Sequence, residues 1–304
     1  METAVMHPTY LPFREEQLLA RFAAASGGGD PAARLEHYRG PLEQLAAAEA
    51  VARVPHQRSA GSAAGDTSLD RDERFWTASA LLSLVEGPSP AADLAALLRL
   101  TYGEAPPFAG FATWADALGP APELYLEVSL PSPPSYQHHL RSQLRRHVLT
   151  YQQYRQGTET TKLEGASLVD AVVVSPTTGM AVVVVAEVLA DIASSVTYDV
   201  VRNELARLVD VTLDAHKGHP QPALRTRRPD RTCVLLLTPE VFRDDRTSRL
   251  YGHLHTAYTT HPDSLEKHLP HRPGPVVRSA AGRLGWATWE DVERVRPGSL
   301  PWRR

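Results

Sequence analysis

The sequence contains little cysteine and no long apolar run, and both shortages narrow the kind of protein that it can encode. Cys233 is the single cysteine among 304 residues, so an internal disulfide is impossible and a reducing compartment is favoured. No stretch approaches the ~18 consecutive apolar residues that a membrane-spanning helix requires. The first thirteen residues lack the basic start and apolar stretch of a secretory signal. These absences predict a cytoplasmic protein without a membrane partner.

Charge of one sign is not in large excess either. The chain has 32 Lys and Arg against 35 Asp and Glu, a formal net charge of −3, so no overall charge draws it to nucleic acid. Basic residues nevertheless gather in one expected helix and around one expected loop, namely Arg141, Arg145, Arg146 and Arg155, and Lys217, Arg225, Arg227, Arg228 and Arg231. Each patch has two interpretations, a phosphate-binding surface or an ordinary solvated face.

The signature motifs of several enzyme classes are also missing. The sequence has no Gly-x-x-x-x-Gly-Lys-Ser/Thr phosphate loop, no His-Glu-x-x-His and no Gly-x-Ser-x-Gly. The histidines between positions 253 and 271 do not have the spacing of a zinc site with cysteine partners. The chemistry must therefore be sought in other residues.

Two valine-rich segments give the clearest secondary-structure signal. Leu168–Val174 and Ala181–Val185 are short and rich in β-branched residues, as strands covered on both faces are. The intervening Ser175–Gly179 contains Pro and Gly, which favour a turn. The pattern predicts a hairpin. Because side chains alternate along a strand, Glu187 and Leu189 are expected to point the same way.

A helix is expected after the hairpin. Thr197 is a favourable N-cap, apolar residues then recur at helical spacing, and Gly218 ends the helix. This helix would carry Arg202, Asn203 and Arg207 on its other faces.

Elements are also expected on either side of this unit. A helix is predicted over Tyr136–Arg155 and a strand near Thr160–Leu163, and a further strand over Thr232–Leu237. The expected order is helix, three strands, helix, strand.

Two carboxylates lie on the predicted hairpin, Asp170 in its first strand and Glu187 at the end of its second. Burying an acidic side chain is costly unless it is paired or bound to a metal. Hydrolysis of a phosphodiester needs a metal that neutralises phosphate oxygens and lowers the pKa of the attacking water. Mg²⁺ prefers oxygen ligands and usually takes one or two carboxylates. Asp170, Glu187 and the carbonyl of Val188 are therefore candidate ligands of Mg²⁺ or Mn²⁺.

This order of elements and residues resembles the PD-(D/E)XK nuclease superfamily, which has the restriction-endonuclease-like fold. The family core is a small mixed sheet flanked by helices, with Asp on the second core strand and Glu-x-Lys on the third. Asp170 matches the Asp, and Glu187-Val188-Leu189 matches Glu-x-Lys except at its last residue. The polar helix bearing Arg202, Asn203 and Arg207 is also similar to that of some bacterial members. The resemblance covers about a third of the chain, from Ser135 to Pro239.

The missing lysine has three interpretations. In the first, the cation has moved, and Lys162, Arg202 or Arg207 reaches the same site. In the second, the motif is shifted so that Glu187 occupies the lysine position. In the third, the protein has kept the fold and lost the reaction. The family lysine is thought to orient the water and stabilise developing charge, and losing one such group costs about 10² to 10³ in rate.

Each candidate also has a purely structural interpretation. Asp170 could cap a turn, and Glu187 could pair with Arg202. Arg202 and Arg207 could pair with acidic residues on a solvated helix face, since such pairs form at little cost. Asn203 has no assigned partner. A non-catalytic module that binds nucleic acid or protein predicts an occluded cleft in which Leu189 packs in the core and Arg202 neutralises Glu187.

The remaining regions are expected to be mainly helical. Alanine- and leucine-rich helices are predicted before Pro134, among them Glu15–Ala25, Arg74–Val85 and Pro90–Tyr102. A terminal helix is predicted over Trp286–Val295 with Thr288 as its cap. The division is thus a helical region over 1–134, a nuclease-like core over 135–240 and an extension with short helices over 241–304.

The sequence as a whole predicts an α/β protein that acts on nucleic acid, most readily DNA. Asp170, Glu187, Arg202 and Lys162 are the candidate catalytic residues of a Mg²⁺-dependent endonuclease. Arg141, Arg145, Arg146, Asn203 and Arg207 are the candidate nucleic-acid contacts. The alternative is an inactive nuclease-fold module that binds nucleic acid or a protein partner. Whether the chain forms homo-oligomers is left open.

Overall fold

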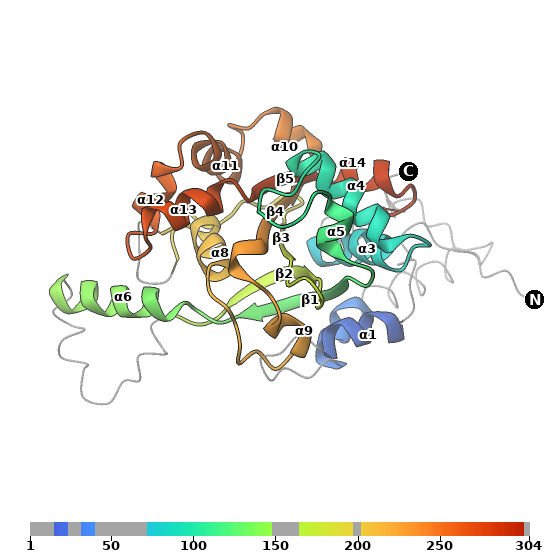
Figure 1. The fold of residues 1–304 in the computed structure, drawn as a ribbon, viewed down its shortest axis with the longest axis horizontal. Coiled ribbons are helices and arrows are strands. Elements are labelled where there is room, and N and C mark those ends of the chain that lie inside the picture. Colours follow the sequence, from blue (N-terminus) through green and yellow to red (C-terminus); the bar gives the residue numbers. More distant parts are fainter. Residues whose placement is uncertain (1–14, 24–31, 40–71, 148–163, 197–201, 301–304) are drawn as a thin grey trace, which may run out of the picture.

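A computed structural model describes residues 15–23, 32–39, 72–147, 164–196 and 202–300, apart from the side chains of 144–147 (Figure 1). Its centre is a five-stranded mixed sheet in the order β1-β2-β3-β4-β5. The strands are Glu123–Leu130, Ser167–Val174, Ala181–Ala186, Thr232–Thr238 and Leu284–Thr288. Strand β2 runs antiparallel to both β1 and β3, while β4 runs parallel to β3 and β5 parallel to β4. The predicted hairpin is therefore confirmed as β2–β3.

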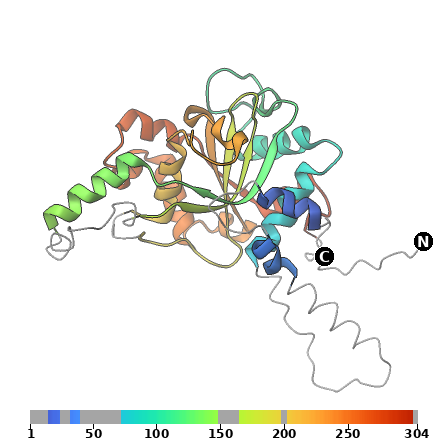
Figure 2. The ribbon, with the colours of Figure 1, turned by 90° about the horizontal axis from the view of Figure 1, so that it is seen from below.

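The central strand β3 is buried along its whole length, because helices cover both faces of the sheet. Val182 and Val184 belong to one hydrophobic cluster, together with residues of α3 (Glu73–Val85), α4 (Pro90–Tyr102) and α14 (Trp289–Val295). Val183 and Val185 belong to the cluster on the opposite face. That face is covered by α8 (Glu204–Thr212), α11 (Leu250–Thr260), α12 (Asp263–His268) and α13 (Gly274–Ala281). Figures 1 and 2 show the sheet between these two helical layers.

Shorter elements complete the described part of the chain. They are α1 (Glu15–Ala23), a helix at 32–39, α5 (Trp114–Leu118), α6 (Pro134–His147), α9 (Pro222–Arg225), the 3₁₀ helix η3 (Pro229–Arg231) and α10 (Glu240–Asp244). Helix α6 extends away from the sheet (Figure 1). No helix within the described ranges is both long and apolar enough to cross a membrane.

The sheet reaches beyond the predicted core of 135–240 on both sides. Strand β1 lies in the region expected to be helical and pairs with β2 over most of its length, from Glu123↔Val174 to Leu130↔Ser167. Strand β5 lies in the expected C-terminal extension and pairs with β4. Backbone pairing thus ties residues from all three predicted parts into one sheet.

Two helices begin later than predicted. Helix α8 starts at Glu204 with Asn203 as its N-cap, so Arg202 and Asn203 precede the helix instead of lying on its faces. Thr197 and the strand expected near Thr160–Leu163 lie outside the described residues. Helix α14 starts at Trp289, and the predicted cap Thr288 is confirmed by its hydrogen bond from the Asp291 N–H.

Candidate active site

The structure brings Asp170 and Glu187 to the same end of the sheet. Asp170 lies on β2, and its Oδ2 accepts a hydrogen bond from the backbone N–H of Ala186 at 2.8 Å. Glu187 directly follows β3, and its N–H donates to the Leu237 carbonyl at 2.9 Å. Its carbonyl accepts a hydrogen bond from Trp289 Nε1 at 3.1 Å. The backbone N–H of Glu187 is thus held by β4 and its carbonyl by α14.

Burial and the charges of neighbouring carboxylates raise the pKa values of both carboxyls. The pKa of Glu187, whose residue is 8% exposed, rises to about 8, chiefly through burial and then through the charges of Glu73 and Asp170. Burial raises the pKa of Asp170 to about 7, against the hydrogen bond from Ala186. Neither carboxylate has an ion-pair partner within the described part of the chain. Each group must therefore hold a proton near neutral pH or meet a cation from outside.

Two further carboxylates add to the negative field. Glu73 is the first residue of α3, and its pKa is raised by burial and by Asp72 and Glu204, against Arg74. Glu204 begins α8, and its Oε2 accepts a hydrogen bond from the Ala193 N–H at 2.8 Å. Sequence analysis missed Glu73, because an acidic residue in the first turn of a helix is ordinarily explained by the helix dipole.

The side chains and the backbone carbonyl at this site provide the oxygen ligands that a hard cation prefers. Asp170 and Glu187 offer carboxylate oxygens, and the buried Val188 offers a carbonyl, which are ligands that Mg²⁺ accepts. In the described ranges no three His, Cys, Asp or Glu residues come close enough together to hold a metal. Glu73 and Glu204 therefore act on the pair through their charge, and the fit is to a cation held by two carboxylates with water or phosphate oxygens completing its shell.

Leu189 does not pack in the core. Its side chain is among the exposed large hydrophobic ones, at 52%, since the chain leaves β3 at Ala186 and bends at Val188 and Leu189. The expectation of a core Leu189 is therefore wrong, and the position of the family lysine faces solvent.

Arg202 lies in a buried ion-pair network. Its side chain is 0% exposed, and its Nη1 contacts Glu164 Oε1 at 2.7 Å while its Nη2 contacts Asp210 Oδ2 at 2.6 Å. Its guanidinium carbon is 3.5 Å from the ring centroid of Tyr136. A buried arginine requires such partners, and these two carboxylates, not Glu187, neutralise it. The predicted Arg202–Glu187 pair and the role of Arg202 as the relocated cation are corrected accordingly.

Arg207 belongs to the same network. Its Nε lies 2.9 Å from Glu164 Oε1, and its Nη2 donates to the carbonyls of Gly165 and Ala166, both at 3.2 Å. On the other side of the network, Asp210 also meets His271 and Arg272. The carboxylate that Arg207 meets lies inside the protein, so its predicted phosphate contact has no support here.

Asn203 also has a structural role. Its Oδ1 accepts the Ala206 N–H at 2.9 Å, and its Nδ2 donates to the Tyr258 hydroxyl at 2.6 Å. It therefore both caps α8 and ties that helix to α11. Lys162 lies outside the described residues.

The two predicted basic patches differ. On α6, Arg141 is partly exposed, while the side chains of Arg145 and Arg146 are outside the described set. In the loop before β4, Arg227 is only 2% exposed, and its Nη1 donates to the Thr212 carbonyl at 2.7 Å. Arg231 donates to the Thr178 carbonyl at 2.7 Å. Backbone carbonyls thus occupy the donors of these two loop arginines.

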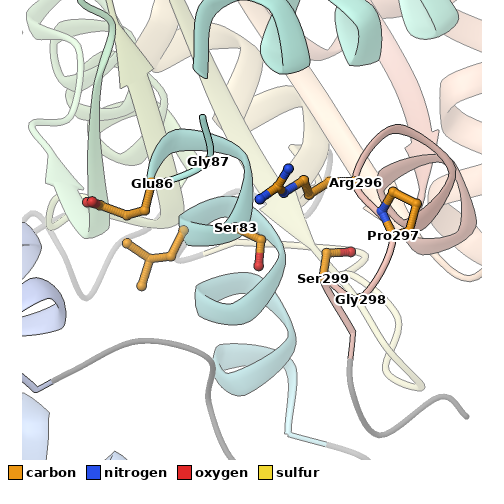
Figure 3. A pocket seen from close by; sticks show the side chains of 8 residues that line it. Ser83, Glu86, Gly87, Arg296, Pro297, Gly298 and Ser299 are labelled. Carbon is orange, nitrogen blue, oxygen red and sulfur yellow. The ribbon is translucent and has the colours of Figure 1, made fainter. Parts of the chain in front are cut away.

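A separate pocket of about 190 Å³ lies between the C-terminal end of α3 and the segment after α14 (Figure 3). Arg296 extends across it toward α3, whereas Glu86 points to the other side of the helix and pairs with Arg21. The pocket is at the opposite end of α3 from Glu73 and contains none of the predicted site residues. Its lining is Leu82, Ser83, Glu86, Gly87, Arg296, Pro297, Gly298 and Ser299.

Comparison with known proteins adds no relative to this picture: no family model, no curated protein and no solved structure matches the chain.

Proposed function

We propose that this chain is a DNA-acting protein of the restriction-endonuclease-like class, which hydrolyses phosphodiester bonds with Mg²⁺ or Mn²⁺ held by Asp170 and Glu187. The observation that carries the proposal is the pair itself. Two carboxylates with raised pKa values lie at one end of the sheet, with no cation of the described chain to neutralise them. Such strongly perturbed groups are characteristic of functional sites.

The topology supports the proposal. Strands β1, β2 and β3 are neighbours in the sheet, and α8 and then β4, parallel to β3, come after them in the chain. Helix α6 lies between β1 and β2 in the chain, whereas the sequence predicted the helix before all three strands. Asp170 is on the second strand of this series and Glu187 ends the third, as the resemblance to the family leads one to expect. The mixed sheet flanked by helices is observed. Its assignment to the restriction-endonuclease-like fold is part of the proposal.

The residues of the chain have distinct parts in such a reaction. A bound metal would neutralise phosphate oxygens and acidify a water molecule. The N–H of Ala186 orients the Asp170 carboxylate by holding Oδ2, which leaves Oδ1 for a ligand. Trp289 and Leu237 fix the Glu187 backbone. A bound cation would favour the ionised form of both carboxyls, which would then hold it as carboxylates.

The test is cleavage of supercoiled plasmid in Mg²⁺, Mn²⁺ or EDTA by the wild type, Asp170→Asn and Glu187→Gln. Glu104→Gln is the matched control, since Glu104 is an exposed carboxylate outside the site. Metal-dependent nicking that both site variants lose and the control keeps is the expected result. Equal nicking by all four proteins would overturn the assignment of the site.

A second readout does not depend on turnover. Metal bound only to the folded protein raises its stability, by about 2.7 kcal/mol at a hundredfold excess over Kd. Thermal unfolding of the wild type should therefore shift upward in Mg²⁺ or Mn²⁺. The shift should grow as the pH passes 8, where Glu187 is ionised, and Asp170→Asn should show little of it.

A second candidate is a nuclease-fold module that binds nucleic acid without cutting it, because leucine stands in place of the family lysine. Its two structural expectations, a core Leu189 and an Arg202–Glu187 pair, are not met. The position of the family lysine is occupied by an exposed apolar side chain, which neither orients water nor stabilises charge. Binding of DNA without cleavage in any of these metals would support this alternative.

A further inference from the structure

Two arginines lie beside the segment that follows Glu187, in the connection between α10 and α11. Arg249 immediately precedes α11, and its Nη2 donates to the Leu189 carbonyl at 3.3 Å. Arg246 lies three residues earlier in the same connection and is exposed. This connection follows the carboxyl end of β4, the strand that pairs with β3 through Ala186↔Leu237. Both arginines therefore belong to the sheet end that carries the carboxylate pair.

Asp191 fixes the position of this connection. Its Oδ2 accepts the Leu250 N–H at 2.7 Å and its Oδ1 accepts the Tyr251 N–H at 3.2 Å. The free N–H groups at the start of α11 are thus occupied by a residue four positions after Glu187. Burial raises the pKa of Tyr251, and the charges of Arg249 and Glu187 act on the same hydroxyl in opposite directions. The Tyr251 hydroxyl therefore lies within range of both charges.

Neither arginine has an acidic partner in the described part of the chain. The other arginines of this edge do: Arg243 pairs with Asp291 and Glu240, and Arg294 pairs with Asp291. The Nε of Arg249 is buried without a hydrogen-bond partner. Asp245 directly precedes Arg246 in the sequence, but its carboxylate accepts hydrogen bonds from the N–H and hydroxyl of Thr247.

Aromatic rings hold both guanidinium groups. The guanidinium carbon of Arg249 is 4.5 Å from the ring centroid of Phe242, and that of Arg246 is 5.6 Å from the ring centroid of Trp286. Stacking of this kind orients an arginine while its N–H edge stays available for a planar or tetrahedral anion. Two oriented, unpaired arginines next to a carboxylate pair are suited to hold a phosphate group.

We propose that Arg246 and Arg249 bind phosphate groups of the DNA backbone next to Asp170 and Glu187. This inference rests on the proposed function and deepens it. The backbone carbonyl of Leu189 holds Arg249 beside the segment that follows Glu187. The phosphates thus meet two arginines on one side and the carboxylate pair with its cation on the other.

Binding of a labelled DNA duplex in EDTA, measured by fluorescence anisotropy, tests this without any cleavage. Arg246→Ala and Arg249→Ala should each weaken binding about tenfold and lower the slope of log Kd against log salt by about 1 between roughly 50 and 200 mM salt. The double variant should lose about twice the slope of either single variant. Arg249→Lys should recover most of the slope, because the slope counts charges. Arg99→Ala, an exposed arginine on α4, is the matched control and should bind as the wild type does.

The outcomes separate this inference from the proposed function. Wild-type affinity and slope in both single variants would overturn the phosphate clamp, as would an equal loss in Arg99→Ala or a wild type that does not bind the duplex. Binding that depends on both arginines, in a protein that cuts no DNA in Mg²⁺ or Mn²⁺, would keep the clamp and reject the nuclease. Asp170→Asn should bind like the wild type in EDTA, since its role is toward the metal. Thermal unfolding of each variant shows whether it is folded.

Discussion

The carboxylate of Asp170 accepts a hydrogen bond from the backbone N–H of Ala186 at 2.8 Å. This side-chain hydrogen bond joins β2 to β3 beyond the point where their backbone pairing ends. The backbone register of the two strands ends at Ala171↔Val184. Beyond it, a side chain of β2 takes up an N–H of β3, one residue before Glu187. The two carboxylates are thus positioned by the hairpin itself, and their spacing does not depend on a loop.

This contact predicts different results for two substitutions of Asp170. Asp170→Ala leaves the Ala186 N–H without its acceptor, and a buried unsatisfied donor costs about 1–3 kcal/mol. Asp170→Asn keeps an acceptor oxygen in place and should be close to neutral. The comparison is made by urea unfolding at pH 5, where Asp170 is protonated in the folded state because its pKa is about 7. Equal stability of the two variants would contradict the contact.

Glu187→Gln should stabilise the protein at high pH and not at low pH. The pKa of Glu187 is about 8 in the folded protein against an ordinary 4.5, so the folded state binds the proton more tightly than the unfolded state does. Wild-type stability therefore falls as the pH rises from about 4.5 to about 8 and then levels off. At about 1.36 kcal/mol per pKa unit, the gain from Gln is on the order of 5 kcal/mol above pH 8.

Urea unfolding at pH 5 and pH 9 checks this, with Glu104→Gln as the exposed control. A Gln variant whose advantage is the same at both pH values would show that burial does not hold the proton on Glu187.

Leu189→Lys should raise the rate of cleavage if the proposed chemistry is correct. The side chain at this position is 52% exposed, so a lysine can replace it with a change in stability within about 0.5 kcal/mol. One charge-stabilising group is typically responsible for about 10² to 10³ in rate. Leu100→Lys is the matched control, because Leu100 is also 52% exposed and lies on α4. Plasmid nicking rates under single-turnover conditions measure the effect, and equal rates in both lysine variants would speak against the site.

Arg202→Met should unfold the protein more readily without a specific effect on catalysis. Removal of one partner of a buried ion pair costs about 3–5 kcal/mol, and here Glu164 and Asp210 would both lose a partner. Arg278→Met is the control, since its pairs are half exposed and such pairs contribute about 0–1 kcal/mol. Urea unfolding and nicking rates are compared for both. An Arg202→Met protein with normal stability and no activity would contradict this prediction and support a catalytic role for Arg202.

Local signals in the sequence were enough for several elements. Helix α4 has the predicted bounds, Pro90–Tyr102, because Pro at the start and Gly after the end limit it. The β2–β3 hairpin and the cap at Thr288 are also set by neighbouring residues. Such features depend on a few positions of chain and are therefore visible without tertiary structure.

The features that the sequence did not predict depend on contacts between residues far apart in the chain. Strand β5 has five residues including a glycine, too few to show a period, and is a strand because β4 lies beside it. Arg202 and Glu164 are 38 positions apart, so nothing local indicates that they pair. The helix expected from Thr197 begins at Glu204, and Arg202 is instead drawn into the protein by its two carboxylates. For the site, the two carboxylates could be named from the sequence, whereas Glu73, Arg246 and Arg249 reach it only through the fold.

The position of β5 at the edge of the sheet also determines how the protein can be shortened. Every residue of β4 is buried, and β5 covers its free side through Val234↔Leu284 to Thr238↔Thr288. A fragment that stops near residue 240 would expose a seven-residue apolar strand with unpaired backbone groups, which is a template for aggregation. It would also lack Trp289, which holds the carbonyl of Glu187. Soluble expression should therefore require the C-terminal residues through α14, and a truncated nuclease-like core would be a poor reagent for any of the assays.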